Sequence, residues 1–326
     1  FQAFKQYQMA GEDIDFSEEF SVLQRIFDGV SLLGDYNDKI KDNAMAQGEV
    51  LSAKYITHLL GKRGIRATFA DSRRFYVTDS HFGNAQLVEE ASQEKTRAYF
   101  AQIPKGVTPI VTGFIAANAQ GQTTTLGRNG SNYSASILAS ILEAEELQNY
   151  THVDGIFTAN PELVSDARII RQLSFEEANE LANFGTSILH AKTIIPLLEK
   201  QIPLRILNTF KPDESGTLIC QAESNKGGIR AISVLENYAL VILEGRGLLG
   251  KVGVDARIFR ALAQAEISVS IISQGSSERG IGFLVANKDA QKAKQALERE
   301  FELDVYSHDV SGVSLVQEVG VVSIVG

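Results

Sequence analysis

Residues 108–146 read TPIVTGFIAANAQGQTTTLGRNGSNYSASILASILEAEE, and this stretch decides how the first part of the chain is expected to fold. Residues 108–117 form a β-rich apolar run that ends in small residues, which is typical of a buried strand. Residues 118–122 make a turn, and residues 123–146 run through a glycine-rich loop into an amphipathic helix. A strand, a glycine-rich loop and a helix in that order indicate part of an α/β domain.

The flanking sequence continues this alternation. Residues 16–75 are expected to be mostly helical, because apolar residues recur there at helical spacing. A short strand and turn are predicted over 148–161, and a further strand over 202–210. Between them lie two helical segments, 173–185 and 193–201. Strands that alternate with helices predict a largely parallel sheet.

The character of the chain changes near residue 222. The polar, glycine-containing stretch 222–228 is a plausible linker. The sequence beyond it predicts, in order, a strand pair (231–244), a helix (250–266), two strands (268–274 and 280–286), a second helix (289–301) and a last strand (303–307). That βαββαβ order is the ferredoxin-like motif.

The composition excludes several classes of protein. The 326 residues suit two domains, and 44% apolar with 22% charged residues is ordinary for globular proteins. The net charge of −9 argues against nucleic-acid binding, and no apolar run reaches the roughly 18 residues that a membrane span needs. Cys220 is the only cysteine, which excludes an internal disulfide and any zinc site built on cysteines. A cytoplasmic compartment is therefore expected.

Both ends of the sequence suggest a piece of a longer chain. It opens on Phe1, without the basic start and apolar stretch of a signal peptide. It closes on VGVVSIVG (319–326), which reads as a strand with no chain following it.

A glycine fingerprint at residues 245–250 invites a dinucleotide-binding interpretation. The motif GRGLLG lies between a predicted strand and a predicted helix, as G-x-G-x-x-G does in that fold. The next strand, however, ends in Ser273 and Gln274 rather than in an acidic residue that could hold a ribose hydroxyl. The glycines are better explained by a tight strand-to-helix connection in a small-molecule sensor.

The loop 125–134 is the stronger site candidate. Gly127 and Gly130 permit close backbone approach, and a helix from about Ser131 would present free amides and its positive dipole end. Arg128 adds a cation suited to a carboxylate or phosphate, and Ser131 and Ser134 add hydroxyl donors. The alternative is a solvated loop with an ordinary helix cap.

Five blocks of sequence, in this order and spacing, resemble the aspartate kinase family. They are LLGDYNDKIKDNAMAQGEVLSA (32–53), VTGFIAANAQGQTTTLGRNGSNYSA (111–135), YTHVDGIFTANPELVSDARII (150–170), FGTSILHAKTI (184–194) and IPLRILNTF (202–210). The resemblance covers about residues 25 to 326. Downstream, the βαββαβ unit resembles the ACT regulatory domain of that family.

The resemblance implies an α/β fold, namely a mostly parallel amino-acid-kinase sandwich followed by a ferredoxin-like ACT domain. The implied division is a catalytic domain over 1–222 and a regulatory region over 223–326. The first ACT module would cover about 227–308, and a second would start at about 314–326. SQGSSE (273–278) resembles the threonine-sensitive enzymes that are often fused to homoserine dehydrogenase more than the lysine-sensitive ones.

The activity implied is phosphoryl transfer from ATP, with Mg²⁺, to the side-chain carboxylate of L-aspartate. Carried over by position, Glu49 would contact the substrate amino group. The residues that would hold the carboxylates are Arg128, Asn129, Gly130 and Ser131. Those that would lie along the nucleotide are Thr151, His152, Val153, Asp154, Phe157 and Pro161. No protein-held metal site is implied.

This sequence departs from the family mainly on the nucleotide side. It lacks the K-F-G-G-T-S loop, whose lysine meets the transferring phosphate in that family. Five further positions lose charge or a hydrogen-bonding group: Asn132 replaces an acidic residue, His152 an aspartate, Phe157 a tyrosine, Glu162 an arginine and Ser187 a lysine. Either other groups such as Lys192 bind ATP, or catalysis has decayed.

The regulatory half is expected to bind an amino acid where ACT modules pair. The residues expected to bind the effector are Gln274 and Ser276 at a strand end, Gly250 in the earlier loop 247–255, and Asp255 on the helix that follows this loop. Threonine is favoured over lysine, and the partner would be an identical subunit in a homodimer or larger homo-oligomer.

Three other interpretations of the function stay open. One is a degenerate kinase domain that only senses amino acids for an attached homoserine dehydrogenase. Another is an amino-acid kinase acting on glutamate or carbamate, although such enzymes lack the ACT extension. A nicotinamide oxidoreductase could lie only in a C-terminal extension of the chain.

Overall fold

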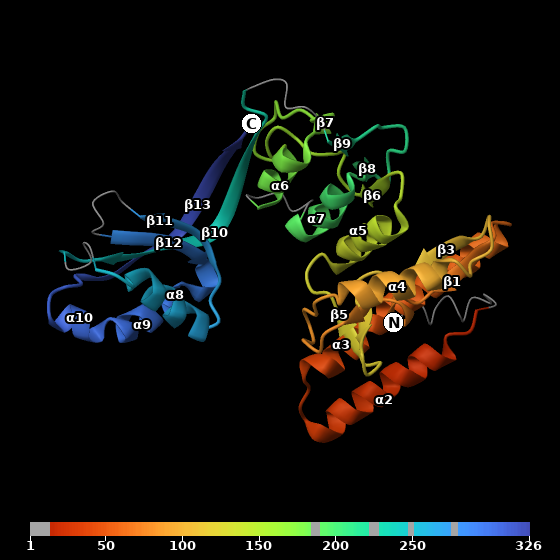
Figure 1. Cartoon of the computed structure of the whole chain (residues 1–326), viewed down its shortest axis with the longest axis horizontal. Helices are drawn as coiled ribbons and strands as arrows, with labels where there is room; N and C mark the ends of the chain where they lie inside the picture. Colours follow the sequence, from red (N-terminus) through yellow and green to blue (C-terminus); the bar gives the residue numbers. More distant parts are fainter. Residues whose placement is uncertain (1–13, 184–189, 222–227, 247–250, 275–279) are drawn as a thin grey trace. The chain divides into compact units, whose positions relative to one another are not determined.

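The computed structural model shows two compact units (Figure 1). It describes residues 14–183, 190–221, 228–246, 251–274 and 280–326. The first unit comprises residues 1–157 and 169–227, and the second comprises 158–168 and 228–326. Each unit has its own sheets and its own hydrophobic core.

The described helices of the first unit are α2 (Ser17–Leu33), α3 (Asp38–Lys62), the 3₁₀ turn η1 (Ser72–Arg74), α4 (Glu89–Phe100), α5 (Gly130–Leu142), α6 (Phe175–Asn183) and α7 (Ala191–Lys200). Its described strands are β1 (Ala67–Ala70), β2 (Val77–Thr78), β3 (Thr108–Val111), β4 (Ile115–Asn118), β5 (Thr123–Thr125), β6 (Leu147–Thr151), β7 (Gln172–Leu173), β8 (Leu204–Asn208) and β9 (Thr217–Ile219).

Helices α2 and α3 confirm most of the helical stretch predicted over 16–75. Gly34 ends α2 in the left-handed conformation (φ 68°), and the side chain of Asn37 caps α3 by accepting a 3.0 Å hydrogen bond from the Ile40 N–H. The prediction fails beyond Lys62, where the chain turns and enters β1.

The sheets of the first unit are rich in parallel pairs, as expected. Strand β1 pairs with β3, β2 with β4, β6 with β8 and β7 with β9, all in parallel, while β5 and β9 also add antiparallel pairs to β4 and β8. The single strand predicted over 108–117 is wrong. Phe114 has a left-handed backbone (φ 68°) that breaks the run, so β3 and β4 lie in different sheets.

Apolar side chains from helices and strands hold this unit together. Phe75 and Tyr76, both almost fully buried, pack in one cluster with Leu126 at the start of the glycine-rich loop. Val50 of α3 packs against Ile115 of β4 in another.

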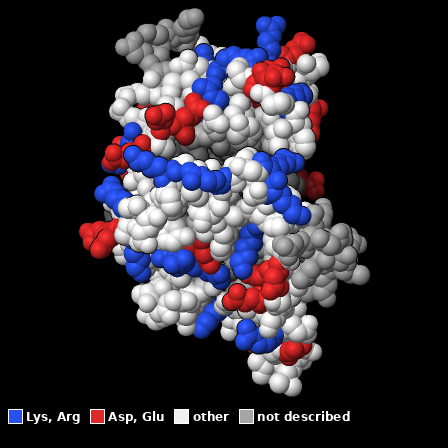
Figure 2. Space-filling view, turned by 90° about the vertical axis from the view of Figure 1, so that its right-hand side faces the viewer, with Lys and Arg blue, Asp and Glu red and all other residues white. Residues whose placement is uncertain are grey.

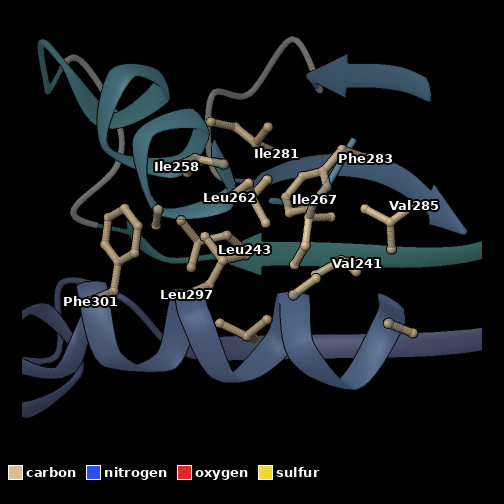
Figure 3. Close-up of a cluster of buried hydrophobic side chains, with 14 of the residues drawn as sticks. Val241, Leu243, Ile258, Leu262, Ile267, Ile281, Phe283, Val285, Leu297 and Phe301 are labelled. Atoms are coloured by element: carbon tan, nitrogen blue, oxygen red, sulfur yellow. The ribbon is translucent and has the colours of Figure 1, made fainter. Parts of the chain in front are cut away.

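The second unit contains β10 (Ala231–Glu244), α8 (Val254–Gln264), β11 (Val269–Gln274), β12 (Gly280–Ala286), the 3₁₀ turn η3 (Asn287–Asp289), α9 (Ala290–Glu300), α10 (Glu302–Tyr306) and β13 (Gly312–Val325). Its sheet has the order β11-β12-β10-β13 with antiparallel pairs throughout, which confirms the ferredoxin-like prediction. Alternate residues of the strands, such as Val241 and Phe283, face α8 and α9 and form the core (Figure 3).

Two details of the predicted second unit are wrong. Residues 303–307 fall on the short helix α10 and its end rather than on a strand, and the fourth strand is β13. Residues 231–244 form one strand rather than a pair, with register shifts near Tyr238. Residues 314–326, where a second module is expected to start, lie on β13, which pairs with β10 from Glu244 down to Ala231.

The segment 158–168 leaves the first unit and joins the second. Phe157 and Ile169 form an antiparallel bridge at its base, and the Thr158 N–H donates a 2.8 Å hydrogen bond to the Arg168 carbonyl. The Ile232 N–H of β10 donates to the Thr158 carbonyl at 2.8 Å. The segment therefore packs with the sheet of the second unit, although the residues on either side of it belong to the first unit.

Charged side chains of both signs are mixed over the face drawn in Figure 2, where a band of Lys and Arg crosses the middle. Among the described residues, no helix is both long enough and apolar enough to span a bilayer.

Candidate active site

The glycine-rich loop leads directly into α5, as predicted. Asn129 precedes the helix in the left-handed conformation (φ 56°), and Gly130 begins it. Arg128, Asn129 and Ser131 are exposed, whereas Gly130 is buried. The loop thus presents a guanidinium, an amide and a hydroxyl next to the first-turn N–H groups of a helix, where anions are favoured.

Close contacts explain both glycines of the loop. A Cβ on Gly127, whose φ is +76°, would lie 2.5 Å from the Asn84 Oδ1. A Cβ on Gly130 would lie 2.6 Å from a ring carbon of Phe114. Any side chain at either position would move the loop away from its neighbours.

Ser134 does not serve as a free hydroxyl donor, which corrects the prediction. It is buried, its Oγ donates to the Gly130 carbonyl at 2.9 Å, and it accepts from the Phe114 N–H at 2.9 Å. Ser134 thereby ties the break between β3 and β4 to the first turn of α5. Ser131 remains the exposed hydroxyl of the pair.

A buried carboxylate fixes the start of the loop. Asp42 of α3 is completely buried, and its Oδ2 accepts from the N–H groups of Gly83 (2.8 Å) and Thr125 (3.0 Å). Its Oδ1 accepts from the Thr125 hydroxyl at 2.7 Å. One side chain therefore joins α3, the loop at residue 83 and the end of β5.

Glu49 lies two helical turns beyond Asp42 on the same face of α3, because seven residues make nearly two full turns. Its neighbour Val50 packs in one buried cluster with Ile115 of β4. Partial burial raises the pKa of the Glu49 carboxyl. Burial therefore destabilises the ionised form of Glu49 unless a cation lies nearby.

The N-terminus of α7 adds a second cation beside the loop. The Lys192 Nζ donates to the Asn84 Oδ1 at 3.1 Å, and this is the same Asn84 that packs on Gly127. The His190 Nδ1 accepts from the Lys192 N–H at 3.2 Å. Burial, with smaller contributions from Lys192 and Arg128, lowers the pKa of His190, so this ring is neutral at pH 7.

The residues expected on the nucleotide side gather at the ends of two parallel strands. Thr151 ends β6, and its carbonyl accepts from the Thr209 N–H (2.8 Å) after β8. Asp154 accepts from the Asn208 Nδ2 and the Lys211 Nζ, both at 2.6 Å. These hydrogen bonds lower the pKa of Asp154, and the bond from Lys211 contributes most. Ligands of α/β folds bind in such crevices beyond the carboxyl ends of parallel strands.

The other nucleotide candidates differ in how they are placed. His152 is exposed, Val153 is partly buried and Phe157 lies in the bridge to Ile169. Pro161 is exposed on the segment 158–168, which belongs to the second unit.

Two of the effector candidates lie within the described residues. Gln274 is exposed at the end of the edge strand β11, and Asp255 is exposed in the first turn of α8. Gly250, Ser276 and also Ser187 lie outside the described residues. Close packing explains why residue 245 of the fingerprint is a glycine, because a Cβ there would collide with the carbonyl oxygen of Asp309.

Sequence reasoning missed four polar residues that organise these sites: Asp42, Asn84, Asn208 and Lys211. Asn208 and Lys211 end a predicted strand, which is where polar side chains of α/β enzymes gather, so they could have been found. Asp42 and Asn84 act through contacts with distant parts of the chain, and no local pattern points to them.

The described residues contain no group of three or more His, Cys, Asp or Glu side chains placed to hold a metal ion.

The structure is that of an α/β protein with a glycine-rich loop at a helix N-terminus, followed by a ferredoxin-like unit. Residues 6–208 match the amino acid kinase family, and residues 241–301 match an ACT domain. The chain belongs to the amino acid kinase family.

Its relatives within that family are aspartokinases. It is 34% identical over 322 residues to the bifunctional aspartokinase/homoserine dehydrogenase of Haemophilus influenzae, covering 98% of this chain and 39% of the relative. It is 31% identical over 257 residues to the lysine-sensitive aspartokinase 3 of Escherichia coli, covering 77% and 57%. The chain thus spans less than two thirds of these relatives.

The fold also matches a solved aspartokinase. The structure of Escherichia coli aspartokinase III in complex with aspartate and ADP superposes with a TM-score of 0.79 at 26% identity, covering 99% of this chain and 73% of that one. The same enzyme in complex with lysine and aspartate gives a TM-score of 0.72 at 27% identity, covering 92% and 67%. The predicted resemblance and fold class are confirmed.

Proposed function

We propose that this chain carries the aspartate kinase activity of its relatives, under feedback control through its ACT unit. The proposal rests on the exposed Arg128 and Ser131 at the start of α5, together with the partly buried Glu49 of α3. Helix α3 is tied to the start of the glycine-rich loop through the hydrogen bonds from Thr125 to Asp42. A carboxylate for an ammonium group and a guanidinium for a carboxylate are what an amino-acid substrate requires.

In this reaction a side-chain carboxylate oxygen of aspartate attacks the γ-phosphorus of ATP. The bond to the bridging oxygen breaks, ADP leaves, and 4-phosphoaspartate forms. Glu49 would hold the α-ammonium group, and Arg128 with the first-turn N–H groups of α5 would bind carboxylate. Such a transfer asks the protein mainly to position its substrates and to neutralise charge.

The ends of β6 and β8 would hold the nucleotide, with Thr151, His152, Val153 and Asp154 along one wall. The pairing of Asp154 with Lys211 at 2.6 Å leaves this wall with little net charge. Mg²⁺, when bound, would supply neutralisation of the phosphates there.

Threonine is the effector proposed for the ACT unit. The support is the exposed Gln274 amide at the end of an edge strand, since an amide can both donate to a carboxylate and accept from an ammonium group. We further propose that edge strands pair two copies of the chain. A Gln274→Ala variant that binds threonine as well as the parent protein would contradict the effector assignment.

A second function deserves a test because the Asp154–Lys211 pair cancels a cation on the nucleotide side. In this alternative the kinase-like unit binds amino acids without transferring phosphate and regulates an attached homoserine dehydrogenase.

Aspartate-dependent hydroxamate formation with ATP and Mg²⁺, measured on the full-length protein with and without threonine, separates the two. The kinase proposal predicts hydroxamate that is suppressed by threonine and lost in Arg128→Ala. Threonine binding without any hydroxamate would support the sensing module instead.

A further inference from the structure

The exposed charge beside the glycine-rich loop exceeds what Arg128 alone supplies. Lys192 reaches the loop from α7, a separate helix, and its Nζ lies 3.1 Å from the Asn84 Oδ1. In the part of the chain that the structure describes, neither Arg128 nor Lys192 is paired with a carboxylate.

Asn84 holds this lysine in a defined place. Its carbonyl oxygen accepts from the ammonium group and also packs against the Gly127 backbone closely enough to exclude any side chain there. An amide is neutral, so it positions Lys192 without cancelling its charge. A carboxylate at residue 84 would instead neutralise Lys192 in an ion pair.

The pKa of His190 is consistent with two cations near the loop. Lys192 and Arg128 both disfavour protonation of that imidazole. Two cations from different elements therefore act on the same imidazole, which burial also keeps neutral.

One carboxylate, Glu49, and two cations, Arg128 and Lys192, are opposite in sign and equal in number to the charges of a dicarboxylic amino acid. Such a substrate carries one ammonium group and two carboxylates. Glu49 can meet the first, and Arg128 can meet only one of the other two. We propose that Lys192, positioned by Asn84, binds the second carboxylate and so gives the site its preference for aspartate over its amide; this inference rests on the proposed function.

The test compares L-aspartate with L-asparagine as ligands, by calorimetric titration of the full-length protein. Lys192→Gln should weaken aspartate binding about ten- to a hundredfold, the range for loss of a charge-assisted hydrogen bond, and should reduce the preference over asparagine by the same factor. Lys192→Arg should keep most of that preference. Lys200→Gln, at the other end of α7, is the matched control and should change neither affinity.

A second readout checks the placement without any substrate. In Lys192→Gln the pKa of His190, followed by NMR, should rise, because a neighbouring cation has been removed. A preference for aspartate that is unchanged in Lys192→Gln would overturn the inference. A large loss of ADP affinity in that variant, with aspartate binding intact, would assign Lys192 to the nucleotide instead.

The two levels of the proposal fail in different ways. A parent protein that binds no aspartate at all would remove the proposed function, and the assignment of Lys192 with it. A parent protein that binds aspartate, with a Lys192→Gln variant that binds it equally well, would remove only the assignment of Lys192.

Discussion

Replacing Asp42 tests whether a buried carboxylate sets the position of the glycine-rich loop. Asp42→Ala leaves two backbone N–H groups and one hydroxyl without their acceptor, among them those of the almost fully buried Thr125. Each unsatisfied buried donor costs about 1–3 kcal/mol, and partial hydration of the Gly83 side lowers the sum. We expect the free energy of unfolding to fall by about 3–5 kcal/mol.

Asp42→Asn should be much milder, and the reason lies in which oxygen accepts what. The Asn oxygen can take the place of Oδ2 and accept both N–H groups, while its NH₂ takes the place of Oδ1. The Thr125 hydroxyl can then rotate and accept instead of donate. All three hydrogen bonds survive and only the charge is lost, so a cost of about 1 kcal/mol is expected.

Urea unfolding followed by far-UV circular dichroism measures these changes. Asp38→Ala, an exposed position one turn earlier on α3, is the control and should cost no more than about 1 kcal/mol. The reasoning is refuted if Asp42→Ala stays within about 1 kcal/mol of the parent protein, or if Asp42→Asn is equally damaging.

Three further predictions concern charge and packing. Because burial raises the pKa of Glu49, aspartate affinity should fall as the pH drops through that raised value, and calorimetry on Glu49→Gln should show weak binding without this pH dependence. Gly127→Ala should cost about 1–3 kcal/mol in urea unfolding, and Asn84→Gly should recover part of that loss by removing the clashing amide. Asp304, whose pKa Arg257 lowers from 3.8 to about 2, stabilises the fold above its ordinary pKa, and that stabilisation is lost as the pH falls toward about 2. Asp304→Asn should therefore cost about 1–2 kcal/mol at pH 7, and pH-dependent unfolding should show the difference shrinking between pH 4 and 2.

Local patterns predicted the elements whose causes are local. The passage from loop to α5 follows from a glycine pair and helical apolar spacing, and the βαββαβ order follows from alternating strands and amphipathic helices. Residues 303–307 were misread because their fold has a tertiary cause. Asp304 pairs with Lys251 at 2.8 Å and with Arg257 at 2.7 Å, and these contacts favour the short helix α10 over the expected strand.

The candidate site was predictable in part for the same reason. Arg128 and Ser131 stand in a motif whose chemistry can be read from the residues, whereas Glu49 was found only through resemblance to a family. The link from Asp42 to Thr125 spans 83 residues of sequence, and the link from Lys192 to Asn84 spans 108. No periodicity carries such pairings, so a single sequence could not reveal them.

The distribution of charge indicates which half of the proposed reaction the described residues serve best. Near the glycine-rich loop, Arg128 and Lys192 keep their charges unpaired among the described residues. Glu49 lies on α3, the helix whose Asp42 binds Thr125 at the start of that loop. At the ends of β6 and β8, Lys211 is already neutralised by Asp154. A triphosphate needs more positive charge than an amino acid does. Under the proposed function, the unpaired cations among the described residues therefore serve the amino-acid acceptor rather than the nucleotide.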